Sequence, residues 1–185
     1  FAFIQHMIYQ LADNGTAAII LPHGVLFRGG AEAVIREYII KEQNYLDAVI
    51  GLPANLFYGT SIPACILVLK KCRTSDDNIM FIDASANFER AGNQNTLTDT
   101  QVNDIVAAYG ARQAIEKFAS VVNISQIVLN EYNLNISRYV DTFEREAVYD
   151  LTKISSDIGD NQLEINKIDK KIAEFCKELG IPGPF

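Results

Sequence analysis

Two aromatic residues, Phe57 and Tyr58, stand directly before a glycine in the stretch NLFYGTSIPACILVL, residues 55–69. Gly59 is a natural turning point, and the apolar run after it is typical of a buried strand. A ring in such a loop is exposed unless it covers something, so the pair predicts a stacking surface for a flat ligand. The alternative is that one ring fills the core at the end of the sheet. Adjacent residues point in different directions, so this alternative accounts for one ring more easily than for both.

A second candidate site follows the apolar stretch TAAIILP, in the segment HGVLFRGG. Pro22 and His23 end a predicted strand, and ligands of open α/β sheets bind at the carboxyl ends of strands, so both are candidates for a pocket edge. Arg28 is a candidate contact for a phosphate group. The pair Gly29–Gly30 either holds an anion on its backbone amides or only turns the chain into a helix. Glu32 favours the turn, because its charge already satisfies the helix dipole.

The composition excludes several kinds of site. The sequence has no P-loop, no Gly-x-Ser-x-Gly and no Cys-x-x-Cys, and its two histidines and three cysteines show no ligand spacing, so no metal is expected. The cysteine usage is typical of a reducing compartment. No apolar stretch approaches the roughly 20 residues that span a bilayer, so no membrane partner is expected. The net charge of −7 argues against a self-sufficient nucleic-acid-binding protein, although the acidic excess lies after residue 75.

The elements that must position these residues alternate between helix and strand. Helical spacing of apolar residues before Asn14–Gly15 predicts a first helix, and a second is predicted for 31–43. Continuous apolar runs predict fully buried strands at 16–22, 45–53, 64–71 and 78–85. This order predicts an open α/β sheet with helices on both faces. Because the first helix has no cap and no strand before it, we expect the chain to be part of a larger domain.

Beyond residue 90 the predicted structure is mainly helical. Thr98 and Gln101 have the pattern of a capping box at the start of a helix, and Ser125 is a candidate cap for another. After about residue 150, a seven-residue repeat predicts a helix with a coiled-coil-like stripe. The stripe either packs on its own domain or binds a partner. Its residues are Ile158, Ile165, Ile168, Ile172, Phe175 and Leu179.

Four stretches together resemble the modification (M) subunit of type I restriction–modification systems, a family of adenine-specific DNA methyltransferases that use S-adenosylmethionine. They are AAIILPHGVLFRGGAEAVIREYII, LDAVIGLPANLFYGTSIPACILVLKK, IMFIDAS and NEYNLNISRYVD. The blocks occur in the family's order over residues 1 to about 145, whereas the later tail matches only in its helical character. The resemblance implies an α/β fold: the later half of a class I, Rossmann-like methyltransferase sheet followed by a helical C-terminal region.

The resemblance also implies a division of the chain into three parts. Residues 1–90 are expected to be the C-terminal part of the methyltransferase α/β domain. Residues 91–150 are expected to form a helical extension that includes the segment NLNISRYVD, and residues 151–185 the coiled-coil-like helix.

Individual residues acquire roles from the same resemblance. Phe57, and after it Tyr58, is implied to stack on a target adenine that has swung out of the DNA helix. Pro22 and His23 are implied to border the pockets for the base and the cofactor, and Arg28 to contact a DNA phosphate. The stripe of the terminal helix is implied to dock on a specificity subunit, in a complex with or without a restriction subunit. Such a complex would act in the cytoplasm of a bacterium or archaeon.

Two motifs of the family are missing from the 185 residues: the glycine-rich cofactor loop and the Asn-Pro-Pro-Phe tetrapeptide that holds the adenine amino group. We therefore expect this chain by itself neither to bind S-adenosylmethionine well nor to methylate DNA, and we assign no catalytic or cofactor-binding residue. One rival hypothesis is a non-catalytic α/β interaction module that dimerises through its terminal helix. A second keeps the methyltransferase sheet but moves the substrate to RNA or protein.

Overall fold

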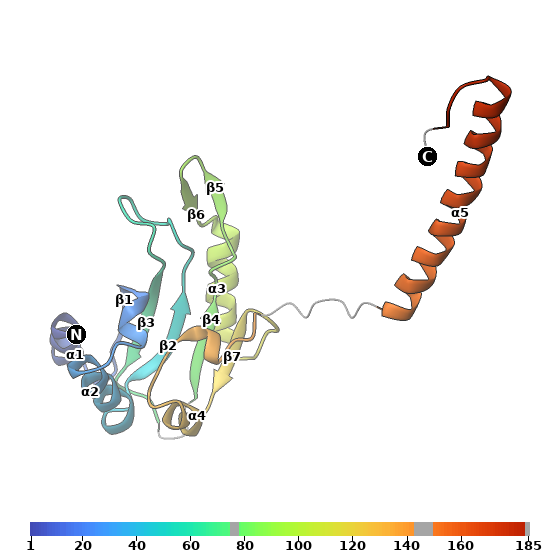
Figure 1. Ribbon diagram of the computed structural model, residues 1–185. Coiled ribbons are helices and arrows are strands. Elements are labelled where there is room, and N and C mark those ends of the chain that lie inside the picture. Colours follow the sequence, from blue (N-terminus) through green and yellow to red (C-terminus); the bar gives the residue numbers. More distant parts are fainter. Residues whose placement is uncertain (75–77, 143–149, 184–185) are drawn as a thin grey trace. The chain divides into compact units, whose positions relative to one another are not determined.

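The computed structural model describes residues 1–74, 78–142 and 150–183 (Figure 1). The chain divides into two compact units, residues 1–143 and 144–185. The three-part division at residues 90 and 150 stays a prediction.

The first unit is built on a five-stranded sheet with the order β1-β3-β2-β4-β7. β2 pairs in parallel with β4, and the other pairs are antiparallel, so β1, β2 and β4 run in one direction. Their carboxyl ends therefore meet at one edge of the sheet, together with the first residues of β3 and β7. The strands are β1 (Thr16–Pro22), β2 (Leu46–Gly51), β3 (Ala64–Lys70), β4 (Ile79–Asp83) and β7 (Ala119–Val122).

Helices cover both faces of this sheet, as the continuous apolar strands predicted. Two clusters of buried side chains form the core, one on each face of the sheet. The first contains alternate strand residues and buried side chains from all the helical elements of the unit except α2 and α3. The second contains the remaining strand residues and buried side chains of α3. The mixed α/β class is thereby confirmed. The helical elements are α1 (Ala2–Gln10), η1 (His23–Leu26), α2 (Ala31–Glu37), η2 (Tyr38–Glu42), α3 (Asp99–Ala111), α4 (Ile124–Leu129) and η3 (Ile136–Arg138).

β1 differs from its prediction as a fully buried strand. Its residues alternate between exposed and half-buried, and Ile20 is 53% exposed. β1 lies at the edge of the sheet, and α3, which packs against β4, does not reach it (Figure 1). A run of apolar residues therefore reads as buried even where only one face of the strand is covered.

The segment after residue 85 contains strands that the sequence reading missed. β7 adds a fifth strand to the sheet, and β5 (Glu89–Ala91) pairs with β6 (Gln94–Thr96) in a separate hairpin. Its two-residue turn begins with Gly92 at φ +65°, a conformation that glycine adopts without strain. Both strands of the hairpin are short and polar, so they lack the apolar pattern from which a strand is predicted.

The helix ends confirm one predicted cap and correct another. Thr98 and Gln101 form the capping box at the start of α3, with both reciprocal hydrogen bonds present. α4 is instead capped by Asn123, whose Oδ1 accepts hydrogen bonds from the backbone N–H and the hydroxyl of Ser125. Ser125 was therefore the wrong candidate, because Asn123 stands two residues earlier and has the extended backbone of a cap.

The second unit contains one long helix, α5 (Leu151–Glu178). Asp150 caps it by accepting hydrogen bonds from the backbone N–H groups of Thr152 and Lys153. None of its residues is buried within the unit. Within the described ranges, no helix is both long and apolar enough to cross a membrane.

Candidate functional site

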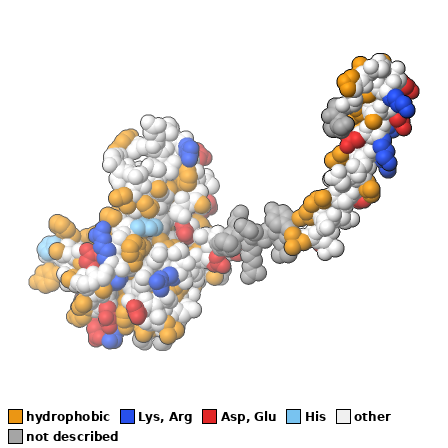
Figure 2. All heavy atoms as spheres, in the orientation of Figure 1, with side chains coloured by type: hydrophobic (Ala, Val, Ile, Leu, Met, Phe, Trp, Pro, Cys, Tyr) orange, Lys and Arg blue, Asp and Glu red, His pale blue; other side chains and the backbone are white. Residues whose placement is uncertain are grey.

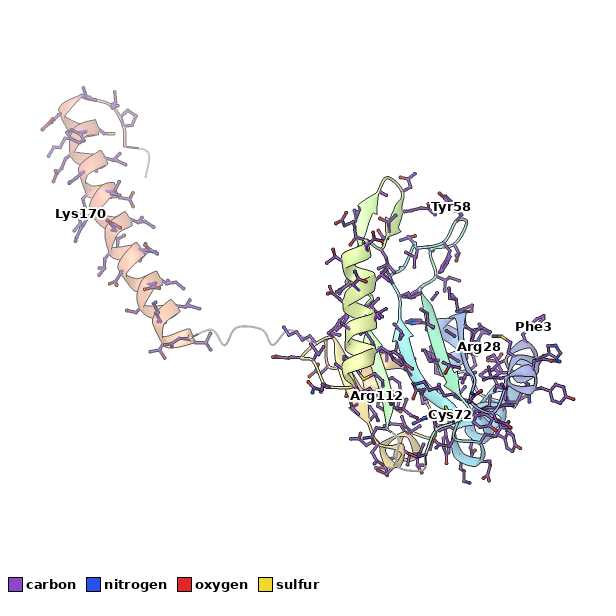
Figure 3. The ribbon with its side chains drawn as sticks, turned by 180° about the vertical axis from the view of Figure 1, so that it is seen from behind. Phe3, Arg28, Tyr58, Cys72, Arg112 and Lys170 are labelled. Atoms are coloured by element: carbon purple, nitrogen blue, oxygen red, sulfur yellow. The ribbon has the colours of Figure 1, made fainter. Side chains whose placement is uncertain are left out.

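Residues 52–63 connect β2 to β3 and form a loop, here called the aromatic loop, at the edge where the parallel strands end. Its base is closed by a hydrogen bond from the Leu52 N–H to the Ala64 carbonyl, and Gly59 turns its tip at φ +75°. Leu56 packs on the core cluster beneath α3, whereas Phe57 is 39% and Tyr58 91% exposed. Figure 3 shows Tyr58 at the end of the loop beside the hairpin. Both rings therefore lie at the rim of the sheet.

An apolar recess opens on one side of Phe57, with a volume of about 210 Å³. We call it the edge recess. Pro22 lies in its wall, as the sequence predicted for a residue at the end of β1, but His23 does not line it. The lining residues are Ile20, Leu21, Pro22, Phe57, Thr60, Ile62, Pro63 and Ala64.

A second recess, of about 510 Å³, lies between the aromatic loop and the β5–β6 hairpin. We call it the hairpin recess. Phe57 and Thr60 line it as well as the edge recess, so this part of the loop separates the two. Its lining is uncharged and consists of Asn55, Phe57, Tyr58, Gly59, Thr60, Ser61, Ala91, Asn93 and Gln94. On the face drawn in Figure 2, side chains around this end of the first unit are mostly apolar or uncharged. Such a surface suits a flat, neutral group with hydrogen-bonding edges.

His23 is more enclosed than its position after Pro22 predicted. Its backbone N–H donates to the Pro63 carbonyl at 3.4 Å, and its Nε2 is buried with no hydrogen-bond partner among the described residues. Burial lowers the pKa of His23; the nearby Asp83 carboxylate and a hydrogen bond to the backbone of Ala64 act in the opposite direction. The imidazole is therefore partly enclosed at the end of β1, where the His23 backbone contacts the aromatic loop at Pro63.

Arg28 lies apart from the aromatic loop, toward α2 (Figure 3). Its side chain is 61% exposed and forms an ion pair with Glu32 at 3.8 Å. Gly30 has φ +65° and occupies the cap position of α2, so the Gly29–Gly30 pair serves to turn the chain into the helix. This supports the turn reading of the pair over the anion reading.

The predicted partner stripe lies on α5. Ile158, Ile165, Ile168, Phe175 and Leu179 are exposed, and Ile172 is half-buried. Apolar side chains in this number on one helix are unusual without a partner. In the described part of the chain, no three His, Cys, Asp or Glu side chains gather as a metal site would need.

Sequence reasoning overlooked Asn95 and the hairpin that carries it. The Asn95 N–H donates to the carbonyl of Asn55, and its Nδ2 donates to the carbonyl of Ala54. The pair Gly92–Asn93 between short polar segments was a turn signal that could have indicated the hairpin. Its docking on the aromatic loop depends on a contact between residues 41 positions apart, which no local pattern contains.

Similarity to known proteins shows the family to which the chain belongs. A family model described as N-6 DNA methylase matches residues 1–147. The chain belongs to the N-6 DNA methylase family. This N-6 DNA methylase chain is 35% identical over 180 residues to the type I restriction enzyme MpnII methylase subunit of Mycoplasma pneumoniae. That match covers 97% of the chain and 33% of the relative.

Solved structures agree with the assignment to the N-6 DNA methylases. The crystal structure of the type I restriction–modification methyltransferase subunit from Streptococcus thermophilus matches with a TM-score of 0.74 and 51% identity, covering 76% of this chain and 30% of that one. Another structure, solved to explain complex assembly and conformational transition of a type I restriction–modification system, covers 96% of this chain and 39% of that one with a TM-score of 0.61. At 17% identity, it shows the fold alone.

These findings confirm the resemblance to type I modification subunits, with one qualification of extent. The chain spans about a third of the length of the relatives that it matches. Roles that depend on the remaining two thirds are therefore proposals.

S-adenosylmethionine, the methyl donor implied by the resemblance, carries a cationic sulfonium, a ribose diol and a charged amino-acid end. No acidic side chain is among the described residues that line the two recesses, so nothing there would bind the diol or the positive charges. The recesses therefore do not fit the methyl donor. Their uncharged, partly aromatic walls suit a nucleobase better.

Proposed function

We propose that this chain is the part of a type I modification subunit that receives the target base, and that the complete subunit transfers a methyl group from S-adenosylmethionine to the exocyclic amine of adenine in DNA. The observation that carries the proposal is the place of Phe57: a half-exposed ring at the carboxyl edge of the sheet, between two uncharged recesses. A methyltransferase cannot reach the adenine amine inside a duplex, so the base must leave the stack.

Phe57 is the better of the two candidates for stacking on the extruded adenine. Stacking a base on an aromatic side chain is worth roughly 1–3 kcal/mol, comparable with the few kcal/mol that unstacking costs. Leu56 anchors the chain immediately before Phe57, so the ring has a supported backbone, whereas Tyr58 is 91% exposed. We assign Tyr58 to the hairpin recess, where it would contact the DNA around the extruded base.

The remaining site residues have subsidiary roles in this proposal. Pro22 supplies part of the wall of the edge recess, and the backbone N–H of His23 holds Pro63, another residue of that wall. Arg28 is exposed enough to contact a DNA phosphate, in competition with its ion pair to Glu32. The methyl donor is expected to be held outside these 185 residues, so this chain by itself is expected neither to bind it well nor to methylate DNA.

The stripe on α5 is proposed to dock on the specificity subunit, which would choose the DNA sequence. A chain with a net charge of −7 and uncharged recesses has little means to hold DNA by itself, so delegation of sequence choice is consistent with its surface. The proposal holds for a complex with or without a restriction subunit, acting on DNA in the cytoplasm of a bacterium or archaeon.

The test is the substitution Phe57→Ala in the full-length subunit, assembled in its complex. We expect kcat/KM for DNA methylation to fall about 10- to 100-fold, which corresponds to the loss of one stacked base. Phe57→Tyr is the matched control and should retain most of the activity, because it keeps the ring. Affinity for S-adenosylmethionine, measured by calorimetry, should stay unchanged in both variants. Full activity in Phe57→Ala would exclude this ring as the stacking surface.

The exposed stripe of α5 also favours a second candidate function, a non-catalytic module that dimerises through this helix. The two functions differ in a simple measurement. Methylation of adenine by the full-length protein, detected with a radiolabelled methyl group, supports the enzyme, and its absence together with a concentration-dependent dimer supports the module.

A further inference from the structure

The aromatic loop is held from outside by one residue of the hairpin. The backbone N–H of Asn95 donates to the Asn55 carbonyl at 3.0 Å, and the side-chain Nδ2 of Asn95 donates to the Ala54 carbonyl at 2.8 Å. Two consecutive carbonyls, just before Leu56 and Phe57, are therefore bound by the same residue. We call this pair of contacts the Asn95 clamp.

The hairpin that presents the clamp has its own supports. Its register pairs Glu89 with Thr96, and the Thr96 hydroxyl donates to the Glu89 carbonyl at 3.3 Å. Leu97, which follows the hairpin, packs on the same core cluster as Leu56 of the aromatic loop. The clamp therefore connects the loop to a structure that is anchored in the core of the first unit.

The rest of the loop has few such connections. Ile62 donates its N–H to the hydroxyl of Thr60 within the loop. Among the described residues, the hydrogen bond from the His23 N–H to the Pro63 carbonyl reaches the loop from outside, but at its far end. Asn55 has φ +54°, a left-handed conformation that asparagine adopts more readily than most residues and that turns the chain before Leu56 and Phe57. The position of Phe57 relative to the sheet is therefore set by two contacts just before it: the packing of Leu56 on the core and the clamp.

We propose that Asn95 is a positioning residue for the target base. It holds the backbone before Phe57, so that the ring forms its stacking surface before the base arrives, and it keeps the hairpin recess open beside Tyr58. The inference rests on the proposed function and adds to it a residue that does not touch the base. A preformed surface binds more tightly than a mobile one, because less ordering is required on binding.

The chemistry of the clamp requires an amide at position 95. The Ala54 carbonyl needs an N–H donor, which aspartate lacks although it has almost the same shape. Asn95→Asp therefore removes the side-chain contact and leaves the size and the backbone contact in place. Asn95→Ala removes the same donor without adding a charge, so agreement between the two variants isolates the lost hydrogen bond.

The experiment uses the full-length subunit in its complex with the specificity subunit. It compares the wild type with Asn95→Asp, Asn95→Ala and Phe57→Ala. Thr96→Val is the matched control, because it removes a hydrogen bond within the same hairpin that does not reach the loop. The measurements are kcat and KM for DNA, KM for S-adenosylmethionine, thermal unfolding, and the fluorescence of 2-aminopurine at the target position of the DNA.

For both Asn95 variants we expect kcat/KM for DNA to fall about 3- to 10-fold, as the loss of one hydrogen bond predicts. The KM for S-adenosylmethionine should stay at its wild-type value, and the unfolding temperature should fall only slightly, because one lost hydrogen bond costs about 1 kcal/mol of stability. The fluorescence of 2-aminopurine should rise, because an extruded base that is less well stacked is less quenched. Thr96→Val should match the wild type in kcat, in both KM values and in fluorescence, with a similarly small fall in unfolding temperature.

Three results would overturn the inference. If both Asn95 variants match the wild type while Phe57→Ala is impaired, the proposed function stands and the clamp has no role. If Thr96→Val is impaired as much as the Asn95 variants, the hairpin as a whole matters and the clamp does not. If the wild-type complex does not methylate adenine, or Phe57→Ala is fully active, the base-stacking function fails first and the role of Asn95 fails with it.

Discussion

His23 shows at the scale of one residue how burial can change a chemical role. The sequence places it after Pro22, where ligands of open α/β sheets bind, yet its Nε2 is buried and has no partner among the described residues. Burial lowers the pKa of its imidazole from 6.5, and Asp83 offsets only part of that effect. A neutral imidazole in this place does not offer a charge to DNA.

The lowered pKa predicts a particular dependence of stability on pH. The unfolded state binds the proton more readily than the folded state, so the contribution of His23 to stability is complete above pH 6.5. It is lost as the pH falls from 6.5 toward the lower pKa of the folded protein. His23→Gln removes this titration, so its unfolding temperature should fall less than that of the wild type between pH 7 and pH 5. Parallel decreases in the two proteins, measured by calorimetry, would contradict this account.

A residue of the site was predictable from the sequence where its own type and its immediate neighbours indicated its position in the fold. Two rings before Gly59 indicated an exposed loop at the sheet edge, and both rings lie there. Asn95 was not predictable, because an asparagine in a polar segment has no local pattern that indicates a carbonyl partner 41 positions away. The burial of His23 also depends on the antiparallel placement of β3 beside β1, which the sequence of β1 does not contain.

Asp47 connects three elements on the side of the sheet opposite the site. It lies in β2, is 2% exposed, and accepts hydrogen bonds from the Tyr109 hydroxyl at 2.5 Å and the Arg112 guanidinium at 3.1 Å. Lys70 at the end of β3 is 3.2 Å from the same carboxylate. Arg73 also forms an ion pair with it. Asp47 therefore joins β2 and β3 to α3.

Asp47→Asn is expected to destabilise the fold more than Tyr109→Phe does. The first change leaves the buried Arg73 and the partly exposed Lys70 and Arg112 beside a neutral amide, and removing one partner of a buried ion pair costs about 3–5 kcal/mol. The second change removes one hydroxyl donor from a carboxylate that keeps its cations, which costs about 1.5–3 kcal/mol. Urea denaturation measures both free energies of unfolding. Equal values for the two variants would show that the charge of Asp47 contributes little.

The helices and strands differ in the sequence pattern that made them predictable. β2, β3 and β4 were predicted because each is a continuous apolar run between covered faces, and the structure buries nearly all of their residues. β7 is four residues long and follows a turn, so its apolar run was too short to separate from a loop. The capping box of α3 was predicted because its two reciprocal side chains are only three residues apart.

At the scale of the whole molecule, the stripe on α5 predicts dependence on a partner. Ile165 is exposed and Ile172 half-buried on a helix with no buried residue of its own. Ile165→Asp with Ile172→Asp in the full-length subunit should abolish assembly with the specificity subunit, because charges in an apolar interface have no partner. Size-exclusion chromatography measures the assembly.

The matched control for this pair is a double substitution on the polar part of the same helix, Asn166→Asp with Lys170→Asp. It adds the same number of aspartates outside the stripe and should leave assembly largely intact. Circular dichroism and affinity for S-adenosylmethionine should be unchanged in both double variants. Survival of the complex with both isoleucines replaced would assign the stripe to packing within the subunit.

The connection between β2 and β3 joins neighbouring antiparallel strands whose pairing places Gly51 opposite Cys65. Its two ends are therefore fixed a few ångströms apart, whatever lies between them. The entropy lost on closing such a segment grows only with the logarithm of its length. Residues can thus be added to or removed from the tip that meets the substrate at little entropic cost, while the β-sheet below keeps its register.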